Sequence, residues 1–342
     1  MLDDLKLIHE RDPQDALGVA GRQHEQLAYT YEVGKVTEAP IQNIVLAGMG
    51  GSALPGVLLT SWARPNVPFE IARDYRIPEY VGPGTLFISS SYSGNTEETL
   101  EALQAAEAAG AQIVVVAAGG KLAAHATEKG YPLVTIPGGI QPRMCTLYFL
   151  SAFIHVLEPL GLVPAGSKAE LLSTAGWLQG ELEKRRPDVA TADNLAKQTA
   201  LDLAGKTVIM YAGPKMFPAA NKWKICFNEN AKNLAWVNQY PEFNHNEFIG
   251  WSGQPLEKPF AVVEIQSNLE HERVQKRFDV STRLLSGKRP APIAIKPQGE
   301  TLLQQLVWAA TLGDFVSIYL AILNNVNPTP VDLVEKFKVE LG

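Results

Sequence analysis

The sequence predicts an α/β protein built from two tandem units, each a mostly parallel sheet flanked by helices. Short apolar runs alternate with helical patterns, give way to a helical stretch over residues 143–205, and then restart. The apolar runs are nearly continuous, which is typical of strands buried on both faces in a parallel sheet. The length of 342 residues suits about two domains.

Several predicted strands in the first half are followed by helical patterns. A helix is expected directly after the first strand. Another is expected over 97–109, because acidic residues occupy its first turn and Gly110 stands just beyond its end. A short helix is expected between the last two strands. The predicted strands cover residues 41–48, 68–75, 84–91, 111–119 and 131–138.

The same alternation defines the second half. We expect an N-terminal domain over residues 1–160, a helical connection over 161–205 and a C-terminal domain over 206–342. The two domains share an organisation, but their sequences do not match closely. The C-terminal domain is predicted to contain strands over 206–213, 258–266 and 291–297 and helices near 217–231, 269–286 and 301–325.

Charge and hydropathy exclude two classes of partner. The net charge is −6, whereas a nucleic-acid partner calls for a basic face. The opening segment MLDDLKLIHERDPQD is acidic and has no apolar run, so no signal peptide is expected. The apolar stretches fall short of the roughly 18 residues that span a bilayer, so no membrane partner is expected either.

Cysteine usage indicates a reducing compartment and no metal site. Cys145 and Cys226 are the two cysteines, and neither has a second Cys or His at ligand spacing. Both are expected to be reduced and buried, as in cytosolic proteins. We therefore expect a cytoplasmic protein that uses no cofactor and no metal.

The first loop with a chemical signature, Gly48–Ser52, joins the first predicted strand to its helix and reads GMGGS. Glycines let the backbone approach a ligand closely and adopt positive φ. The N-terminus of the helix offers free N–H groups and the positive end of the helix dipole, which suit an anion. The hydroxyl of Ser52 adds a further donor.

Two other interpretations of this loop stay open on its residues alone. Gly48, Gly50 and Ala53 fit the G-x-G-x-x-[GA] pattern of dinucleotide-binding folds, and Glu70 and Asp74 follow about 20 residues later. The remaining interpretation is a tight strand-to-helix turn without a ligand.

A second loop favours the anion site. Residues 89–96 read SSSYSGNT, end the third predicted strand and open a helix. Ligands of open parallel sheets bind at the carboxyl ends of the strands, and a hydroxyl-rich loop over a helix N-terminus suits a phosphate. A dinucleotide-binding fold has no need of such a loop. The structural alternative is a Ser-rich turn in which Asn95 or Thr96 caps the helix.

Together, GMGGSA and SYSGNTEET resemble the sugar isomerase (SIS) domain family, whose members bind phosphosugars through this Ser/Thr loop. More narrowly, the chain resembles the bifunctional phosphoglucose/phosphomannose isomerases of archaea and bacteria. This resemblance spans most of the chain. Its further segments are QPR at 141–143, NENAK at 228–232, EFNHNE at 242–247, PTPV at 328–331 and FK at 337–338.

The resemblance implies an isomerase that interconverts glucose 6-phosphate, and also mannose 6-phosphate, with fructose 6-phosphate through a cis-enediol. In such a reaction one base moves a proton between C1 and C2, and a cation stabilises the enediolate. By resemblance, Glu229 is the base and Arg143 is the cation. His245 opens the sugar ring with help from Lys338, and the family supplies this histidine from the other subunit, which implies a homodimer.

Each of these residues also has a structural interpretation. Glu229 fits a solvated carboxylate at a helix end, and Arg143 fits a salt bridge at a helix start. Lys338 fits an exposed lysine of a terminal helix, where Lys336 is a competing choice. The polar, aromatic-flanked context of His245 is unlike that of the histidines in helical contexts, which are more often structural: His125 and His155.

The resemblance further implies that hydroxyls and backbone N–H groups hold the phosphate, which leaves the cations for the reacting end. Thr329 is the nearest match to the hydroxyl residue that lets either C2 epimer bind. Pro55-Gly56 departs from the pattern, because we expect a small residue before the glycine. The implied phosphate-binding residues are Gly50, Gly51, Ser52, Ser91, Ser93 and Thr96.

Other functions remain as alternatives. An isomerase of another phosphosugar would share the phosphate loop but need different groups around Glu229. A non-catalytic phosphosugar-binding regulatory protein usually carries a helix-turn-helix domain, and nothing basic of that kind precedes residue 41. A dinucleotide-dependent enzyme is disfavoured by the SSSYSGNT loop.

Overall fold

The computed structural model describes residues 1–36, 39–253 and 258–341, and it divides into two compact units. Residues 23–177 form the first unit, and residues 1–22 together with 178–342 form the second. The division falls within one long helix, α8 (Ser167–Glu183).

The first unit contains a five-stranded, fully parallel sheet with the strand order β2-β1-β3-β4-β5. β1 (Asn43–Ala47) and β3 (Thr85–Ser91) are neighbours in the interior, and β4 (Gln112–Ala117) follows β3. β2 (Phe69–Ala72) and β5 (Leu133–Thr135) form the edges. All five strands fall within the predicted segments, so this part of the fold prediction is confirmed.

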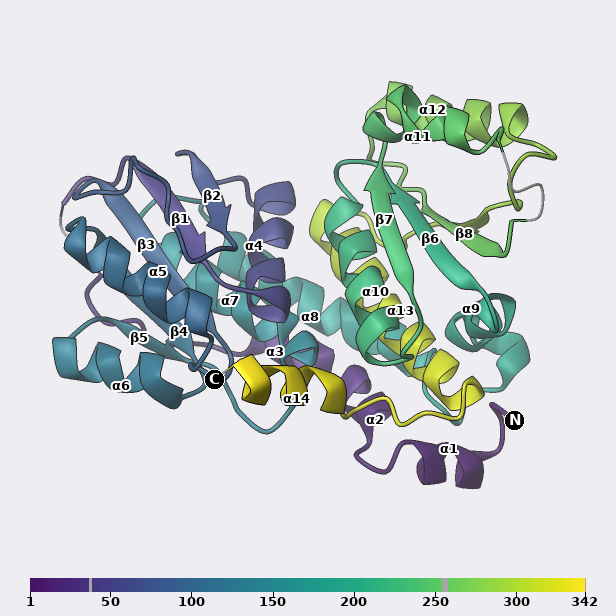
Figure 1. Cartoon of the computed structure of the whole chain (residues 1–342), viewed down its shortest axis with the longest axis horizontal. Helices are drawn as coiled ribbons and strands as arrows, with labels where there is room; N and C mark the ends of the chain where they lie inside the picture. Colours follow the sequence, from purple (N-terminus) through teal and green to yellow (C-terminus); the bar gives the residue numbers. More distant parts are fainter. Residues whose placement is uncertain (37–38, 254–257, 342) are drawn as a thin grey trace. The chain divides into compact units, whose positions relative to one another are not determined.

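Helices α5 (Glu97–Ala108) and α6 (Gly120–Lys129) cover one face of this sheet (Figure 1). Alternate strand residues point into the core that these helices close, among them Val45, Phe87 and Val115. Burying such side chains stabilises the unit by roughly 1.5–3 kcal/mol for each large apolar side chain.

Helices α4 (Gly50–Trp62) and α7 (Thr146–Leu157) belong to the opposite face. Gly56 of α4 explains the unusual Pro55-Gly56 pair, because a Cβ at this position would come within 2.4 Å of Leu46 Cδ2 in β1. The glycine therefore lets α4 lie close to the sheet. α3 (Gln23–Ala28) packs against α7.

The second unit contains a four-stranded, fully parallel sheet with the order β7-β6-β8-β9. The strands are β6 (Thr207–Ala212), β7 (Ala235–Gln239), β8 (Phe260–Ile265) and β9 (Ile293–Ile295). β7 is absent from the strands predicted from the sequence. Its polar edge position explains the omission, because Trp236 is exposed and Asn238 and Gln239 are only half-buried.

Two helical layers cover this second sheet. α12 (Glu272–Leu284), η3 (Glu242–His245) and α11 (Glu247–Gly250) close an aromatic core on one face. α10 (Phe217–Glu229) and α13 (Leu302–Leu323) pack against each other on the other side of the sheet.

The packing of α10 on α13 is close. A Cβ at Gly313 would meet the Trp223 ring at 2.3 Å, and the Trp223 indole N–H donates to the Ala309 carbonyl at 2.6 Å. α13 is long and apolar enough to cross a membrane, so the expectation that every apolar stretch is too short for this is wrong. However, 94% of its apolar window is buried, which makes α13 the core helix of its unit.

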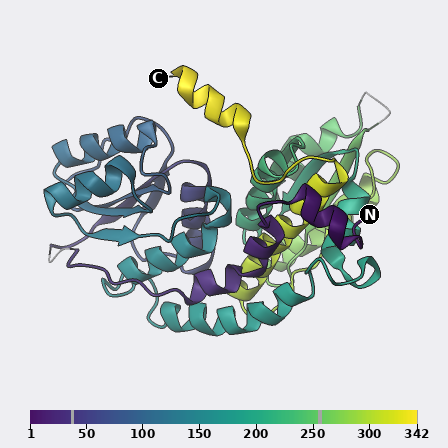
Figure 2. The same ribbon diagram turned by 90° about the horizontal axis from the view of Figure 1, so that it is seen from below.

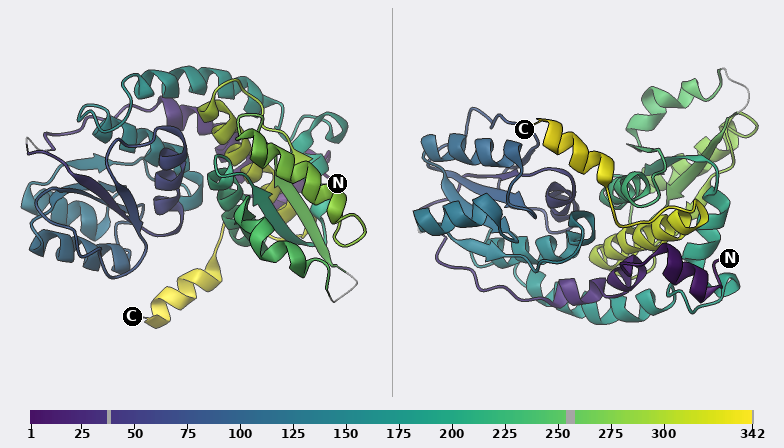
Figure 3. Two further views of the ribbon diagram at one scale, coloured as in Figure 1. Left: turned by 90° about the horizontal axis from the view of Figure 1, so that it is seen from above. Right: turned by 60° about the horizontal axis from the view of Figure 1, so that its bottom comes forward.

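The N-terminal helices α1 (Leu5–Arg11) and α2 (Ala16–Gly21) lie beside α13 (Figure 2). Neither is among the helices predicted from the sequence. The Arg11 guanidinium donates to the Ile322 carbonyl at 2.5 Å. The remaining elements are η1 (Pro142–Met144), η2 (Thr191–Asp193), α9 (Leu195–Leu203) and the C-terminal helix α14 (Asp332–Leu341), the yellow helix at the end of the chain in Figure 3.

Candidate active site

The two glycine- and serine-containing loops meet at the carboxyl edge of the first sheet. β1 and β3 are hydrogen-bonded neighbours, so the residues that follow them emerge side by side. Ser52 Oγ accepts a hydrogen bond from the Tyr92 N–H at 3.0 Å, and Ser90 Oγ donates to the Ser52 carbonyl at 3.1 Å. These bonds join the GMGGS loop directly to the SSSYSGNT loop.

Close backbone approach explains the glycines of the first loop. Gly50 has a φ of +48°, a region that favours glycine. A Cβ at Gly48 would come within 2.8 Å of the Ser90 carbonyl oxygen. A Cβ at Gly51 would come within 2.9 Å of the Pro142 carbonyl oxygen and 3.0 Å of the Arg143 nitrogen. The first loop therefore contacts both the second loop and the segment that carries Arg143.

The hydroxyl groups of the second loop form hydrogen bonds within the loop. Ser91 Oγ and Thr96 Oγ1 are 2.7 Å apart, and Ser91 Oγ accepts from the Gly94 N–H at 3.2 Å. Ser93 Oγ accepts from the Asn95 N–H at 3.2 Å. Ser52 and Ser91 are buried, whereas Ser93 is exposed. The loop thus presents hydroxyls at several depths.

The helices that follow these loops leave their N-termini open to a ligand. Within the described residues, neither Met49 at the start of α4 nor Thr96 at the start of α5 caps its helix with its own side chain. Asn95, the other capping candidate, instead accepts from the Lys121 N–H of α6 at 3.0 Å. Unbonded N–H groups at a helix N-terminus attract anions, so the two starts and the hydroxyls together can hold a phosphate.

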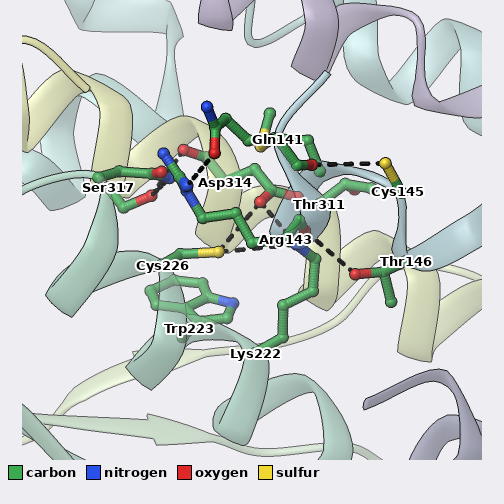
Figure 4. A network of polar contacts seen from close by, with 12 residues as sticks. Gln141, Arg143, Cys145, Thr146, Lys222, Trp223, Cys226, Thr311, Asp314 and Ser317 are labelled. Carbon is green, nitrogen blue, oxygen red and sulfur yellow. Dashed lines mark hydrogen bonds and ion pairs between the residues drawn. The ribbon is translucent and has the colours of Figure 1, made fainter. Parts of the chain in front are cut away.

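Arg143 lies in η1 of the same unit and is buried. Its guanidinium donates to Gln141 Oε1 at 3.3 Å, and its carbonyl accepts from Thr146 Oγ1 at 3.1 Å (Figure 4). The structure therefore brings Arg143 together with Gly51 and Ser52 through the backbone contact of Gly51. Gln141 and Tyr92 were not among the predicted site residues, although both belong to segments with a chemical signature, QPR and SSSYSGNT.

Glu229 is the last residue of α10 and is half-buried. Its neighbours are held in place by side-chain hydrogen bonds. Asn228 Nδ2 donates to the Lys224 carbonyl at 2.7 Å, and the buried Asn230 donates to Ser317 Oγ of α13 at 2.8 Å. The carboxylate is thus presented on a rigid helix end.

Thr329 belongs to a segment that is fixed to the turn after Glu229. Lys232 Nζ donates to the Asn327 carbonyl at 2.6 Å, and Asn324 Nδ2 donates to the Ala231 carbonyl at 3.2 Å. The Thr329 N–H in turn donates to Asn327 Oδ1 at 2.9 Å. The structure therefore brings the neighbourhoods of Glu229 and Thr329 together within the second unit.

His245 lies at the other edge of the second sheet. α10 begins at the carboxyl end of β6 and ends at Glu229, which precedes β7, whereas His245 follows β7 and is exposed. A helix of 13 residues is roughly 20 Å long. Glu229 and His245 of one chain are therefore separated by about the length of α10, and the structure does not bring them together.

Lys338 lies on α14, none of whose side chains is buried. Its ammonium pairs with Glu335 Oε1 at 2.8 Å, and both side chains are more than 60% exposed. Lys336 is exposed on the same helix. The structure places neither lysine beside the other predicted site residues of the second unit.

The second unit has its own helix start at the carboxyl edge, but a carboxylate already occupies it. Glu270 Oε1 accepts from the Lys215 N–H at 2.8 Å and the Met216 N–H at 3.1 Å, just before α10. Burial raises the pKa of Glu270, against these N–H donors. A Cβ at Gly213 would come within 2.4 Å of the Glu270 carboxyl, so the glycine makes room for it. This carboxylate therefore fills the helix start that an anion would otherwise occupy.

A pocket of about 470 Å³ opens at the carboxyl edge of β8 and β9. Amide and hydroxyl side chains dominate its lining, and they are bonded to one another. Ser267 Oγ donates to Gln305 Oε1 at 2.5 Å, and Gln305 Nε2 donates to Asn268 Oδ1 at 2.7 Å. In the described part of the chain, no predicted site residue lines this pocket.

A buried polar group supports the helix that carries Glu229. Lys222 Nζ pairs with Asp314 Oδ1 at 2.6 Å, and Cys226 Sγ donates to the same oxygen at 3.1 Å (Figure 4). Burial lowers the pKa of Lys222, but the Asp314 carboxylate outweighs it and holds this pKa above its usual value. The pair ties α10 to α13 about two helical turns before Glu229.

Comparison with known proteins gives the family context. The family model described as "bacterial phospho-glucose isomerase C-terminal SIS domain" matches residues 192–341 of this chain. A bifunctional phosphoglucose/phosphomannose isomerase of Caldicellulosiruptor bescii is 36% identical over 328 residues, which cover 93% of this chain and 96% of that protein.

Two further similarities concern a related reaction and the fold. A D-glucosamine-6-phosphate 4-epimerase of Sulfolobus acidocaldarius is 33% identical over 214 residues, covering 62% of this chain and 65% of that protein. The crystal structure of a glucose-6-phosphate isomerase-like protein of Thermus thermophilus superposes with a TM-score of 0.66 at 17% identity, covering 99% of this chain and 98% of that one. The latter similarity shows the fold alone.

Proposed function

We propose that this chain interconverts glucose 6-phosphate and mannose 6-phosphate with fructose 6-phosphate. The premise is that the chain belongs to the family of bifunctional phosphoglucose/phosphomannose isomerases. The observation that carries this proposal is the junction of the two loops at the carboxyl edge of the first sheet, where Ser52 Oγ bonds to the Tyr92 N–H. A hydroxyl-rich cradle over two open helix starts matches a monoester phosphate dianion.

In this proposal the phosphate is bound by neutral donors. The N–H groups at the start of α4 and α5 face it, and the side chains of Ser52, Ser91, Ser93 and Thr96 add hydroxyls. Phosphate binding then contributes affinity without placing a lysine or arginine there. The buried guanidinium of Arg143 remains for the oxygens that gain negative charge during the reaction.

Glu229 is proposed to carry the proton between C1 and C2. Removing the C2 proton of the open-chain aldose gives a cis-enediolate. Transfer of the hydroxyl proton from O2 to O1 and return of the carbon-bound proton to C1 give the ketose. Return to either face of C2 yields the glucose or the mannose epimer. The fixed helix end of α10 supports this role, because Asn228 and Asn230 hold the backbone on both sides of Glu229. Thr329, tied to the same turn, is the proposed specificity residue.

His245 and Lys338 are proposed to open the sugar ring. Because Glu229 and His245 lie at opposite edges of one sheet, the pair can meet only if a second chain supplies one of them. This separation supports a homodimer in which the histidine comes from the partner subunit. Lys338 requires α14 to leave its exposed position, and the apolar side chains of Leu333 and Phe337 give that helix a face to bury.

The test is the conversion of fructose 6-phosphate by the purified chain with EDTA present, with glucose and mannose 6-phosphates quantified separately. The wild type is expected to form both. Glu229→Gln should lower kcat by roughly 10²–10⁴-fold, because it removes the base. Glu183→Gln, at an exposed carboxylate at the end of α8, is the matched control and should leave the rate unchanged.

Glucose 6-phosphate alone would remove the second specificity and keep the mechanism. No product from folded protein would refute the proposed reaction. In that case glucosamine 6-phosphate, the substrate class in the name of the epimerase relative, is the next compound to supply. Full activity of Glu229→Gln would refute its role as the base.

A further inference from the structure

The side chain of Tyr92 links the phosphate loop to the segment that leads to Arg143. Its hydroxyl donates to the Pro137 carbonyl at 3.3 Å and accepts from the Ile140 N–H at 3.1 Å. Both partners belong to the connection between β5 and η1, three to six residues before Arg143. One phenol therefore fixes that connection at two points.

The backbone of Tyr92 forms hydrogen bonds to two further segments. Its N–H donates to Ser52 Oγ at 3.0 Å, in the first loop. Its carbonyl accepts from the Ala118 N–H at 3.2 Å, directly after β4. Through its backbone and its hydroxyl, Tyr92 thus connects the first loop, the end of β4 and the approach to η1. Its neighbours Ser91 and Ser93 are proposed phosphate ligands.

The segment held by the phenol contains two consecutive glycines. These are Gly138 and Gly139, and Gly139 has a φ of +93°. A Cβ on either glycine would meet no atom within 4 Å, so neither is packed closely. Two consecutive glycines lose more conformational entropy on ordering than other residues do, so the two hydrogen bonds of Tyr92 matter for where η1 begins.

We propose that Tyr92 is a positioning residue that couples occupation of the phosphate loop to the alignment of Arg143. The inference rests on the proposed function and extends it, because it names the residue through which phosphate binding is converted into catalysis. Binding energy from a non-reacting part of a substrate raises kcat when it is used to order groups at the reacting end. Tyr92 supplies a physical connection for that conversion.

The phenol is suited to this task over the whole working pH range. Burial raises the pKa of Tyr92 to about 12, so the hydroxyl stays protonated and donates and accepts at once. Tyr92→Phe removes both bonds and the interaction of the hydroxyl with the Cys145 side chain, and it keeps the ring, whose centroid lies 6.5 Å from that of Phe149. The substitution therefore isolates the hydroxyl without opening a cavity.

Tyr92→Phe is expected to lower kcat for fructose 6-phosphate roughly 10- to 100-fold, as the loss of one or two hydrogen bonds used in the transition state would do. The KM should change less than about threefold, because the phosphate ligands remain. Tyr131→Phe is the matched control, since Tyr131 is a half-buried tyrosine of the same unit that belongs to neither loop. It should change neither constant.

Calorimetry on protein without turnover separates this inference from the proposed function. The probes are inorganic phosphate and a phosphorylated aldonohydroxamate, a planar anion that resembles the enediolate. Tyr92→Phe should bind phosphate as the wild type does and should bind the hydroxamate more weakly by about the factor lost in kcat/KM. Equal weakening of both probes, or a raised KM at unchanged kcat, would show that Tyr92 only shapes the phosphate loop and would overturn the inference.

A wild type that neither turns over fructose 6-phosphate nor prefers the hydroxamate over phosphate would refute the proposed function itself. A wild type that does both, beside a Tyr92→Phe variant that matches it in kcat and in both affinities, would refute the coupling alone. The two failures are therefore distinguishable.

Discussion

Ser52 Oγ accepts a hydrogen bond from the Tyr92 N–H at 3.0 Å, which makes two loops 40 residues apart one binding surface. Ser52→Ala removes this acceptor and one hydroxyl of the proposed phosphate cradle. The KM for fructose 6-phosphate should rise about tenfold, which corresponds to about 1.4 kcal/mol of lost binding. Steady-state kinetics checks this value, with the exposed Ser173→Ala of α8 as the control.

The separation of Glu229 and His245 predicts complementation between two inactive variants. Glu229→Gln and His245→Asn should each be inactive as homodimers. In a mixed dimer, one of the two sites combines the intact Glu229 of one chain with the intact His245 of the other. Random mixing after dissociation should therefore restore about a quarter of the wild-type rate. Absence of any recovery, with mixed dimers demonstrated by mass, would mean that both groups act from one chain.

Glu270 predicts a specific pH dependence of stability. Burial raises its pKa in the folded state, whereas an unfolded glutamate titrates near 4.3. The folded state thus favours the protonated carboxyl. The contribution of Glu270 to the free energy of unfolding is therefore fully present below about pH 4.3 and is lost as the pH rises through the raised pKa of the folded state.

Glu270→Gln cannot ionise and keeps an acceptor for the Lys215 and Met216 N–H groups. The free energy of unfolding of this variant should therefore increase relative to that of the wild type as the pH rises from 4 to 7. Urea denaturation at several pH values measures this difference, and Glu183→Gln is the exposed control. A difference that is constant with pH would contradict the raised pKa of the buried Glu270 carboxyl.

Breaking the Lys222–Asp314 pair should cause a large loss of stability. Asp314→Asn leaves a buried ammonium without its counter-ion and should reduce the free energy of unfolding by about 3–5 kcal/mol. Asp279→Asn, at an exposed aspartate of α12, should change it by less than about 0.5 kcal/mol. Denaturant titration compares them. A small loss for Asp314→Asn would mean that water or another group replaces the carboxylate.

The five strands of the first unit could be predicted from the sequence, because most of them are apolar runs and its loops carry glycine at positions of close approach. Gly51, for example, faces the backbone of Pro142 and Arg143, so no side chain fits there. The second unit was harder. β7 is a polar edge strand with an exposed Trp236, and its pattern does not separate it from a loop.

That missed strand matters for the site. Glu229 precedes β7 and His245 follows it, so their placement at opposite edges depends on an element that hydropathy does not reveal. The position of Lys338 also could not be predicted, because the amphipathic pattern of α14 implies a buried face, whereas Phe337 is 66% exposed in the single chain. The structural support of Glu229 by Asn230 and Ser317 depends on contacts between α10 and α13, far apart in sequence.

The proposed reaction depends above all on proton transfer by Glu229 between C1 and C2 of a hexose 6-phosphate. The sharpest test is incubation of fructose 6-phosphate with the enzyme in D₂O over many turnovers, followed by mass spectrometry and NMR of the sugar phosphates. We predict carbon-bound deuterium at C2 of the aldoses and at C1 of the ketose, and little or none with Glu229→Gln in the same time. Isomerisation without carbon-bound deuterium, or undiminished exchange by Glu229→Gln, would contradict this role.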